Sequence, residues 1–454
     1  MPEIGMGRSQ LTVDKKWAEL SPEEKREERF KRWLSPNVEF SSPQAQKAYK
    51  ARLTRIIDAI QLREPDRVPV NLPAGYFPTY YAGITLRTAM YDSDELCRAW
   101  LKFMQDFDDM DMFGGPSLVF PGRVSELLDT RISKWPGHGL PADARFHQFV
   151  EGEYMKADEY DVFLNDPSDF CLRFYLPRTL AALEPFQRLS PFTHALGMPT
   201  NFLVPCTMPD VQAAFQAIVD AGRELAKWWE TVEDCSQKVM AEGFPSFRGG
   251  MAMAPFDTFA DTLRGTRGIA MDMYRQPDKL LEAMERVTPL NIQGAVSVAD
   301  ASGGPIIFMP LHKGDDTFMS EKQYETFYWP TLKKVILGLV NDGLVPMLFA
   351  EGSYDRRLEI IKDLPRGAVM WHFDRTDMAR AKEVLGDTAC IAGNVPASLI
   401  CTGTPQAVKE YCRQLIEVCG KGGGYILTGG AAVDKCNPDN LRAMMAAAKE
   451  YGTY

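Results

Sequence analysis

The chain has 454 residues, of which 45% are hydrophobic and 25% are charged, as in ordinary globular proteins with a full core. Its 51 basic and 61 acidic residues give a net charge of −10, which argues against nucleic acid and anionic membranes as partners. No apolar run reaches the roughly 18–20 residues that cross a bilayer, and the N-terminus shows no signal pattern, so we expect a cytoplasmic location.

Two helices are predicted before the main domain. Ser21 is placed to cap a highly charged helix that begins at Pro22, and we expect this helix to lie solvated on the body of the protein. The second helix, over 42–60, carries one apolar stripe suited to packing on the main domain. We therefore interpret residues 1–62 as an N-terminal helical extension that contributes to a homodimer contact, and residues 63–454 as the main domain.

The first part of the main domain has weak periodicity. A short strand is predicted over residues 67–73, whereas residues 115–195 are rich in proline, glycine and aromatic residues. This composition predicts long loops and short helices inserted into the domain, not a separate domain.

Five strand–helix pairs follow one another in the second half of the chain. Their apolar runs span 304–312, 344–351, 368–374, 389–395 and 424–430. Parallel strands need a helical crossover, so this order predicts a parallel sheet, either in a (β/α)8 barrel or in a doubly wound sheet. No glycine-rich fingerprint follows a first strand, which disfavours a dinucleotide-binding domain.

The nine cysteines are scattered and form no Cys-x-x-Cys pair, so we expect reduced, mostly buried thiols. Cys412 and Cys419 illustrate this in the helix predicted over 405–420, which Thr404 is placed to cap. They lie on its apolar face, about 10 Å apart at 1.5 Å per residue. That separation is too large for one tetrahedral zinc site, so we predict that both are core residues.

Every clear strand in this half ends on a polar or ionisable residue. The set comprises His312, Asp315, Asp316, Glu351, His372, Asp374, Asn394 and Thr428. In a barrel, the carboxyl ends of the strands share the face that carries the catalytic groups. Burying so many polar groups without partners would cost free energy, so we predict that they converge on one cavity.

Structural roles are the alternative for the same residues. A histidine at a strand end also occurs as a hydrogen-bonded structural residue, and Glu351 also suits the N-terminus of a helix predicted over 353–364. Asp374 and Asp377 suit helix caps, Asp377 more clearly, and Asn394 suits a turn.

Several segments resemble the uroporphyrinogen decarboxylase superfamily. The segments 253–288, 381–396 and 403–430 carry this resemblance, and 67–81 is similar to the first-strand motif of the group. The resemblance covers about residues 63–453. It implies a (β/α)8 TIM barrel with a cleft at the carboxyl ends of the strands, here with the helical extension and long inserted loops.

The superfamily contains two chemistries, and the decarboxylases are similar to this chain only in outline. Their first-strand motif carries arginines for the carboxylates of a tetrapyrrole, whereas this chain has no basic residue from Val68 to Ile84. A multiply anionic porphyrinogen needs cationic partners. Decarboxylation of uroporphyrinogen itself is therefore disfavoured, and decarboxylation of another substrate is an alternative.

The other branch comprises corrinoid-dependent methyltransferases. Its thiol-methylating members bind zinc through a His-x-Cys motif at the strand matching 345–351 and a later cysteine, whereas here that strand ends Phe349-Ala350-Glu351 and 427–434 has no cysteine. The resemblance therefore favours transfer of a methyl group from a small methylated donor, such as a methyl ether, to a corrinoid protein. A non-catalytic barrel that binds a corrinoid protein or a small ligand is a further alternative.

Methyl transfer would give the residues at the strand ends definite roles. A departing alkoxide or phenolate must be protonated or bound by a Lewis acid. We hypothesise Glu351 as the acid or a metal ligand, His312 and His372 as co-ligands or proton partners, and Asp374 as the residue that orients them. Zinc held by Glu351, His312 and His372 is the metal-dependent version of this hypothesis.

Substrate contacts are expected on the same face. The predicted substrate-binding residues are Tyr76, Phe77, Tyr80, Asp315 and Asn394. The aromatic members, with Tyr81, would line an apolar pocket for the donor, and core packing is the alternative for them.

Overall fold

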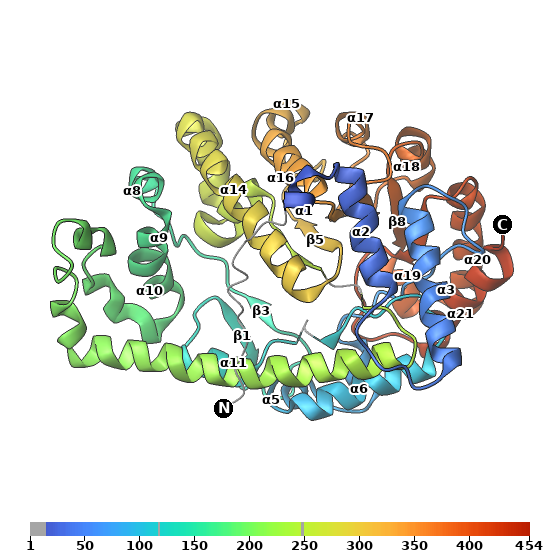
Figure 1. The fold of residues 1–454 in the computed structure, drawn as a ribbon, viewed down its shortest axis with the longest axis horizontal. Coiled ribbons are helices and arrows are strands. Elements are labelled where there is room, and N and C mark those ends of the chain that lie inside the picture. Colours follow the sequence, from blue (N-terminus) through green and yellow to red (C-terminus); the bar gives the residue numbers. More distant parts are fainter. Residues whose placement is uncertain (1–14, 117–118, 247–248) are drawn as a thin grey trace.

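The computed structural model describes residues 15–116, 119–246 and 249–454 (Figure 1). Its centre is a parallel sheet with the strand order β4-β5-β6-β7-β8-β9. These strands span Gly250–Met251, Ile306–Leu311, Val345–Ala350, Met370–Phe373, Cys390–Val395 and Tyr425–Gly429. The sequence prediction of consecutive parallel strands in the second half is therefore confirmed.

Two shorter segments close this sheet into a barrel. Val70 pairs in parallel with Leu427 of β9, and Phe113 pairs in parallel with Ser246, just before β4. The two segments join each other where the amide of Asp111 donates to the carbonyl oxygen of Val70 at 2.9 Å. Eight parallel segments thus form the ring of a (β/α)8 barrel, the fold class that the resemblance implied.

Helices follow the strands and surround the barrel. Between β4 and β5 they are α12 (Pro255–Asp257), the π-helix η6 (Thr258–Leu263), α13 (Gly265–Arg275) and α14 (Pro277–Ser302). Between β5 and β7 they are α15 (Glu321–Gln323), η7 (Tyr324–Tyr328), α16 (Trp329–Asn341) and α17 (Leu358–Ile361). The remainder are α18 (Met378–Leu385), α19 (Ala397–Thr402), α20 (Pro405–Leu415), η8 (Ile416–Gly420) and α21 (Pro438–Tyr451).

The N-terminal helices are α1 (Lys15–Glu19), α2 (Pro22–Leu34) and α3 (Pro43–Ile60). Ser21 caps α2, as the sequence predicts, and it forms a reciprocal capping box with Glu24. The apolar face of α3 packs against the first residues of the barrel strands, including Ile306, Val345 and Ile426. The helix α3 therefore covers the amino-terminal end of the barrel. The predicted packing of its apolar stripe on the main domain is confirmed.

Mostly short elements lie between α3 and the long helix α11 (Pro209–Ala241), and those within 115–195 agree with the short helices predicted there. Near the barrel these are α4 (Phe77–Tyr81), α5 (Leu86–Tyr91), α6 (Ser93–Asp106) and α7 (Gly122–Leu127). Further out are β1 (Ser133–Pro136), β2 (Gly139–Leu140), β3 (Gln148–Phe149), α8 (Tyr160–Asn165), α9 (Pro167–Phe170), η2 (Cys171–Tyr175), α10 (Leu176–Thr179), η3 (Ala181–Arg188), η4 (Phe192–Leu196) and η5 (Val204–Thr207).

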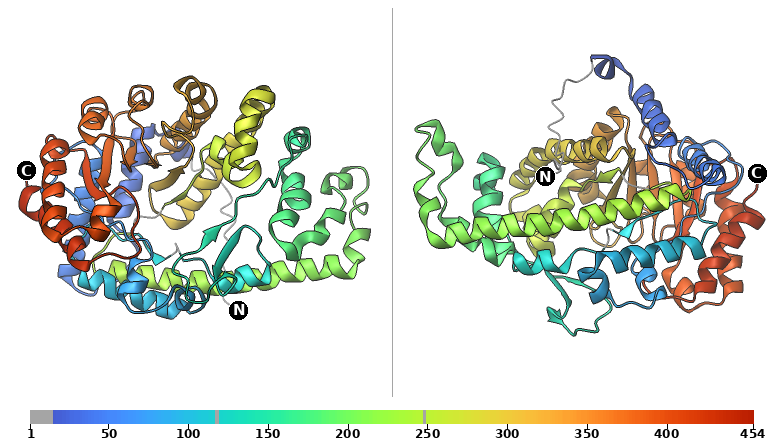
Figure 2. Two further views of the ribbon diagram at one scale, coloured as in Figure 1. Left: turned by 180° about the vertical axis from the view of Figure 1, so that it is seen from behind. Right: turned by 60° about the horizontal axis from the view of Figure 1, so that its bottom comes forward.

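Residues 176–208 form an arm that projects away from the barrel, and the long helix α11 (Pro209–Ala241) returns from it along the lower edge of the molecule (Figures 1 and 2). The arm has a small core of its own, made by Leu183, Phe186 and Leu189 with Val211 and Ala214 of α11.

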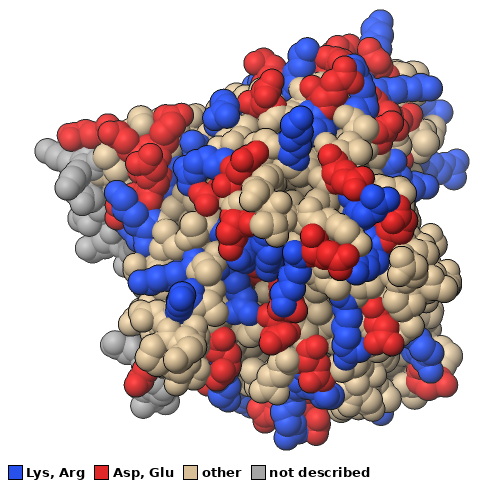
Figure 3. Space-filling view, turned by 90° about the vertical axis from the view of Figure 1, so that its right-hand side faces the viewer, with Lys and Arg blue, Asp and Glu red and all other residues tan. Residues whose placement is uncertain are grey.

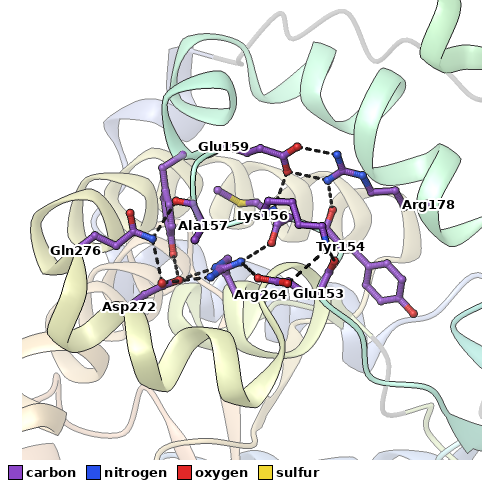
Figure 4. A network of polar contacts seen from close by, with 11 residues as sticks. Glu153, Tyr154, Lys156, Ala157, Glu159, Arg178, Arg264, Asp272 and Gln276 are labelled. Carbon is purple, nitrogen blue, oxygen red and sulfur yellow. Dashed lines mark hydrogen bonds and ion pairs between the residues drawn. The ribbon is translucent and has the colours of Figure 1, made fainter.

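A buried polar network fastens the inserted segment to the barrel helices (Figure 4). Arg264 is 3% exposed and donates to both carboxylate oxygens of Asp272 and to the carbonyl oxygen of Met155. The hydroxyl of Tyr160 also donates to Asp272, at 2.8 Å. A guanidinium with five donors can satisfy several acceptors at once, so one residue of the barrel holds the segment that contains α8.

Two further sequence predictions have clear outcomes. Thr404 caps α20, and Cys412 and Cys419 are fully buried, as expected of core residues. The helix expected over 353–364 is shorter, because only Leu358–Ile361 is helical.

The outer surface carries both signs of charge. On the side of α20 and α21, Lys and Arg side chains are interspersed with Asp and Glu (Figure 3). None of the helices described has the length and apolarity to cross a bilayer.

Candidate active site

Two of the predicted site residues meet at the carboxyl ends of neighbouring strands. Leu311 of β5 pairs with Ala350 of β6, so the residues that follow, His312 and Glu351, emerge side by side. His312 Nε2 lies 3.7 Å from Glu351 Oε1, and the two side chains are 34% and 44% exposed. The pair is thus accessible from the open end of the barrel.

The π-helix η6 supplies a third member of this cluster. Asp261 Oδ2 is 2.6 Å from His312 Nδ1, and Asp261 Oδ1 is 3.5 Å from Lys313 Nζ. A carboxylate on one imidazole nitrogen fixes the ring orientation and leaves the other nitrogen toward Glu351. π-Helical turns are rare and occur frequently at functional sites.

Asp257 holds the backbone beneath the cluster. It is fully buried, accepts hydrogen bonds from the amides of His312 (3.0 Å) and Lys313 (3.2 Å), and accepts another from the Tyr328 hydroxyl (2.7 Å). Burial, reinforced by the charge of Asp261, raises the pKa of Asp257 to about 7.

Sequence reasoning missed Asp257 and Asp261. They do not end a strand, and their signal is weak: two acids four residues apart in an otherwise apolar stretch, "PFDTFADTL". The local π-helical geometry that turns Asp261 toward His312 has no distinctive sequence pattern.

The electrostatic surroundings of His312 and Glu351 favour the protonated form of each group. The hydrogen bond to Asp261 is the largest cause that raises the pKa of His312, to about 9, against the opposing effect of burial. Burial raises the pKa of Glu351, and the carboxylates of Asp374 and Asp261 add to this effect while His312 opposes it. Both groups therefore hold protons at higher pH than their free counterparts, as a general acid requires.

Asp374 and Asn394 lie at the same end of the barrel, but their side chains hydrogen-bond to loop backbone. Asp374 Oδ2 accepts from the amide of Gly352 at 3.1 Å, and Gly352 directly follows Glu351. Asn394 is buried and donates through Nδ2 to the carbonyl oxygen of Thr376 at 2.7 Å. Asp374 thus fixes the segment that carries Glu351, while Asn394 fixes the next loop.

His372 points in another direction. Its Nε2 is 2.8 Å from the carbonyl oxygen of Gly429, and burial lowers the pKa of the imidazole. A neutral ring that donates to this carbonyl is the consistent state. The ring centroid lies 4.7 Å from that of Phe349, so His372 is part of the barrel lining below Glu351.

The predicted substrate-binding residues do not form one wall. Phe77 is 3% exposed and packs against Phe103 and Phe107, which is the core role left open by the sequence. The hydroxyl of Tyr76 contacts His147 of the inserted segment, and that of Tyr80 donates to the Arg145 carbonyl oxygen at 2.5 Å.

The side chain of Asp315 stabilises a turn. Its carboxylate accepts from the amides of Thr317 and Phe318 at 3.0 and 2.8 Å, and from the Thr317 hydroxyl.

The outcome for the alternative roles is mixed. Asp377 caps α18, accepting from the amides of Ala379 and Arg380, as expected. Glu351 caps no helix, because the nearest helix begins only at Leu358.

The three proposed metal ligands do not form a zinc site in this arrangement. His312 and Glu351 are neighbours, but Nε2 of His372 is directed to Gly429. Within the described parts of the chain, no three His, Cys, Asp or Glu side chains are grouped so as to hold a metal ion. The residues therefore do not fit the metal-dependent version of the hypothesis, and an acid–base cluster is the better description.

A (β/α)8 barrel with ionisable groups at the carboxyl ends of its strands has the architecture of an enzyme of the TIM-barrel class. Residues 210–451 match the family model for uroporphyrinogen decarboxylase (URO-D), and the chain belongs to this family. The resemblance seen in the sequence is thereby confirmed.

Two comparisons show known proteins to which the chain is similar. A uroporphyrinogen decarboxylase from Chlorobaculum parvum is 23% identical over 252 residues, which are 53% of this chain and 67% of that protein. A solved structure of a methyltransferase from Methanosarcina mazei is similar with a TM-score of 0.56 and 16% identity, over 88% of this chain and 98% of that one. Both proteins are named as enzymes, and the second likeness extends to the fold alone.

Proposed function

We propose that this protein is a methyltransferase that moves a methyl group from a small methylated donor, such as a methyl ether, to a corrinoid protein in the cytoplasm. The observation that supports it best is the His312–Glu351 pair, which holds a proton at the open end of the barrel. The reduced cobalt of the corrinoid supplies a strong nucleophile, so the protein has to assist the leaving group.

Glu351 is the proton donor in this proposal. As the methyl carbon–oxygen bond of the donor breaks, the oxygen takes the bonding electrons and needs a proton, which reaches it through the carboxyl group of Glu351. His312 stands behind Glu351 and can return a proton to it across the 3.7 Å separation after side-chain adjustment. Asp261 orients the imidazole through its 2.6 Å contact.

The barrel lining suits a small, weakly polar donor. Side chains alternate along a strand, so Phe349 points to the same side as Glu351, and its ring lies 6.1 Å from that of Phe308 on the neighbouring strand. Both rings retain exposed surface, whereas α3 fills the barrel below them. The methyl-bearing end of a donor would therefore rest on apolar rings beneath the acid.

The proposal is tested with the full chain, a reduced corrinoid protein and a panel of methyl ethers and methylamines. We expect loss of the cobalt(I) absorbance with at least one donor, and Glu359→Gln, which alters an exposed surface carboxylate, should leave the rate unchanged. An unchanged cobalt(I) spectrum with every donor, although the same corrinoid protein reacts with a chemical methylating agent, would contradict it.

Decarboxylation is the second candidate, because the family match and the 23% identical relative both carry that name. The acid–base cluster could protonate a carbanion as carbon dioxide leaves. Release of labelled carbon dioxide from a panel of carboxylic acids would favour this candidate. Absence of both activities would favour a barrel that only binds a corrinoid protein or a small ligand.

A further inference from the structure

Residues 145–155 of the inserted segment form a strap over the carboxyl ends of the first three barrel strands. One end lies on α4, which follows the first strand, because the hydroxyl of Tyr80 donates to the carbonyl oxygen of Arg145 at 2.5 Å. At the other end, the amide of Met155 donates to the carbonyl oxygen of Leu263 at 2.8 Å. Leu263 belongs to η6, which follows the third strand, β4. The strap thus forms one side of the barrel mouth.

This side of the mouth lies opposite the proposed proton donor. Around the ring, the strand through Val70 is followed by the strand through Phe113 and then by β4, β5 and β6. Glu351 follows β6, so it lies four strands away from the strand through Val70, on the other side of an eight-stranded barrel. A donor whose methyl group rests at Glu351 can therefore extend its other end toward the strap.

One face of the strap is turned to the barrel. Side chains alternate along an extended segment, so His147, Phe149 and Glu151 share a face. His147 contacts the hydroxyl of Tyr76. Glu151 accepts from the amide of Thr266 at 2.6 Å. Phe149 lies between these two contacts on the same face and is 49% exposed. Its ring is therefore an apolar surface that the chain itself leaves half uncovered.

The contact between Tyr76 and His147 determines which imidazole nitrogen carries the proton. Burial raises the pKa of Tyr76 above its usual range, and desolvation lowers the pKa of His147, so the phenol keeps its proton and the imidazole is neutral. The hydroxyl then donates to Nδ1, which places the ring proton on Nε2. The described part of the chain holds no partner for Nε2, so this N–H group is an unused hydrogen-bond donor.

Arg145 adds a cation beside this donor. Burial and Asp434 raise the pKa of Tyr80 to about 12, and the charge of Arg145 opposes this rise, so the guanidinium lies near the phenol. Arg145 is exposed, and no ion pair within the described ranges includes it. Asp434 brings a negative charge to the same region, but its Oδ1 accepts from the amide of Tyr76 at 2.8 Å. The carboxylate is thus held against the backbone at the start of α4, while the guanidinium is free to pair with a ligand.

We propose that the strap binds a carboxylate on the end of the donor remote from its methyl group. In this strap subsite, the Arg145 guanidinium is the cation, the Nε2–H group of His147 donates a hydrogen bond, and the ring of Phe149 contacts the apolar part of the donor. Arginine suits this role because two of its parallel N–H groups match the two oxygens of a carboxylate. The proposal rests on the proposed function and narrows the donor to a methylated carboxylate.

Binding of unreactive probes tests the subsite without turnover. Calorimetric titration of the full chain with benzoate, benzamide and benzylammonium compares a carboxylate, a neutral amide and a cation, each carried by a phenyl ring. We expect benzoate to bind about tenfold more tightly than benzamide, because it gains a charge-assisted hydrogen bond, and also more tightly than benzylammonium. Absence of benzoate binding at millimolar concentrations, equal affinities for benzoate and benzamide, or tighter binding of benzylammonium would overturn the proposal.

Variants of the strap assign this binding to its residues. Arg145→Met should weaken benzoate binding about tenfold and leave benzamide binding unchanged. Arg366→Met is the matched control, because this exposed arginine precedes β7 and lies at the amino-terminal end of the barrel. His147→Phe should also weaken benzoate binding, with an unchanged circular dichroism spectrum. Equal benzoate affinities of the wild type and Arg145→Met would overturn the proposal.

The result can be separated from the test of methyl transfer. If benzoate binding depends on Arg145 but no methyl ether consumes cobalt(I), the subsite is supported and the methyl-transfer proposal is contradicted. If methyl transfer is observed, Arg145→Met should lower kcat/KM about tenfold for 4-methoxybenzoate and leave it unchanged for 4-methoxybenzyl alcohol. Equal effects on the two donors would overturn the role of the strap.

Discussion

Replacing Asp257 by asparagine should change how the stability of the protein depends on pH. The carboxyl group is fully buried and holds the backbone of His312 and Lys313. Asparagine has the same shape and can still accept through its amide oxygen, but it cannot ionise. The variant should therefore be destabilised at every pH by weaker hydrogen bonds. At pH values where the native carboxyl is ionised, this loss is offset because asparagine avoids the free-energy cost of a buried charge.

The magnitude follows from the pKa of Asp257, which burial raises from the ordinary 3.8 to about 7. Below the ordinary pKa, the group is protonated in both states and has no effect on the pH dependence. Between the two values the unfolded chain releases the proton and the folded chain keeps it, so stability falls as pH rises. The whole fall is about 4 kcal/mol at about 1.4 kcal/mol per pH unit, and about 3 kcal/mol of it comes between pH 5 and 8.

Urea unfolding of the wild-type chain and Asp257→Asn at pH 5 and pH 8 measures this difference. We expect the variant to be less stable by about 1–3 kcal/mol at pH 5, from the weakened hydrogen bonds. At pH 8 the difference in unfolding free energy should have moved by about 3 kcal/mol in favour of the variant, so that the deficit shrinks or changes sign. Equal pH dependence of the two proteins, within about 1 kcal/mol, would refute the argument that the buried carboxyl ionises near neutral pH.

Three further changes probe other parts of the account. His312→Gln should lose less stability than the wild type as pH rises from 7 to 10. The pKa of His312 is about 9 in the folded protein against an ordinary 6.5, so its protonation stabilises the fold fully below pH 6.5, and this stabilisation is lost as pH rises through 9. Parallel unfolding midpoints of the two proteins over this range would contradict the prediction. Arg264→Met should cost about 3–5 kcal/mol by leaving the buried Asp272 without its cation, whereas the exposed Arg267→Met should cost little; equal effects in thermal unfolding would argue against the network. Ile56→Ala should cost about 2–5 kcal/mol because its side chain fills the barrel end, and Lys50→Ala on the exposed side of α3 is the control; similar urea midpoints for both would show that α3 is not part of the core.

The barrel could be predicted from the sequence because the signals for its strands and helices are local and repeated. Each strand run is followed by a helical pattern, and caps such as Ser21 and Thr404 act through neighbouring backbone amides. The carboxyl ends of parallel strands lie on one face, so the proximity of His312 and Glu351 also followed from order alone.

Other features depend on contacts between residues that are distant in the sequence. The hydrogen bond of His372 to Gly429 spans 57 residues, and strand order does not determine which way that ring turns. Asp261 reaches His312 through a π-helical turn, and the arm of α11 exists because the inserted segment builds its own small core around Phe186. These arrangements are set by tertiary packing, which periodicity does not encode.

The most direct test of the proposed chemistry compares Glu351→Gln with wild type on two donors. With a methyl ether, whose leaving oxygen needs a proton, we predict a loss of about 100-fold or more in the rate of cobalt(I) disappearance. With a methylated sulfonium donor, which leaves as a neutral thioether without a proton, the rate should change much less. A loss below about tenfold with the ether, or equal losses with both donors, would contradict the role of Glu351 as the proton donor.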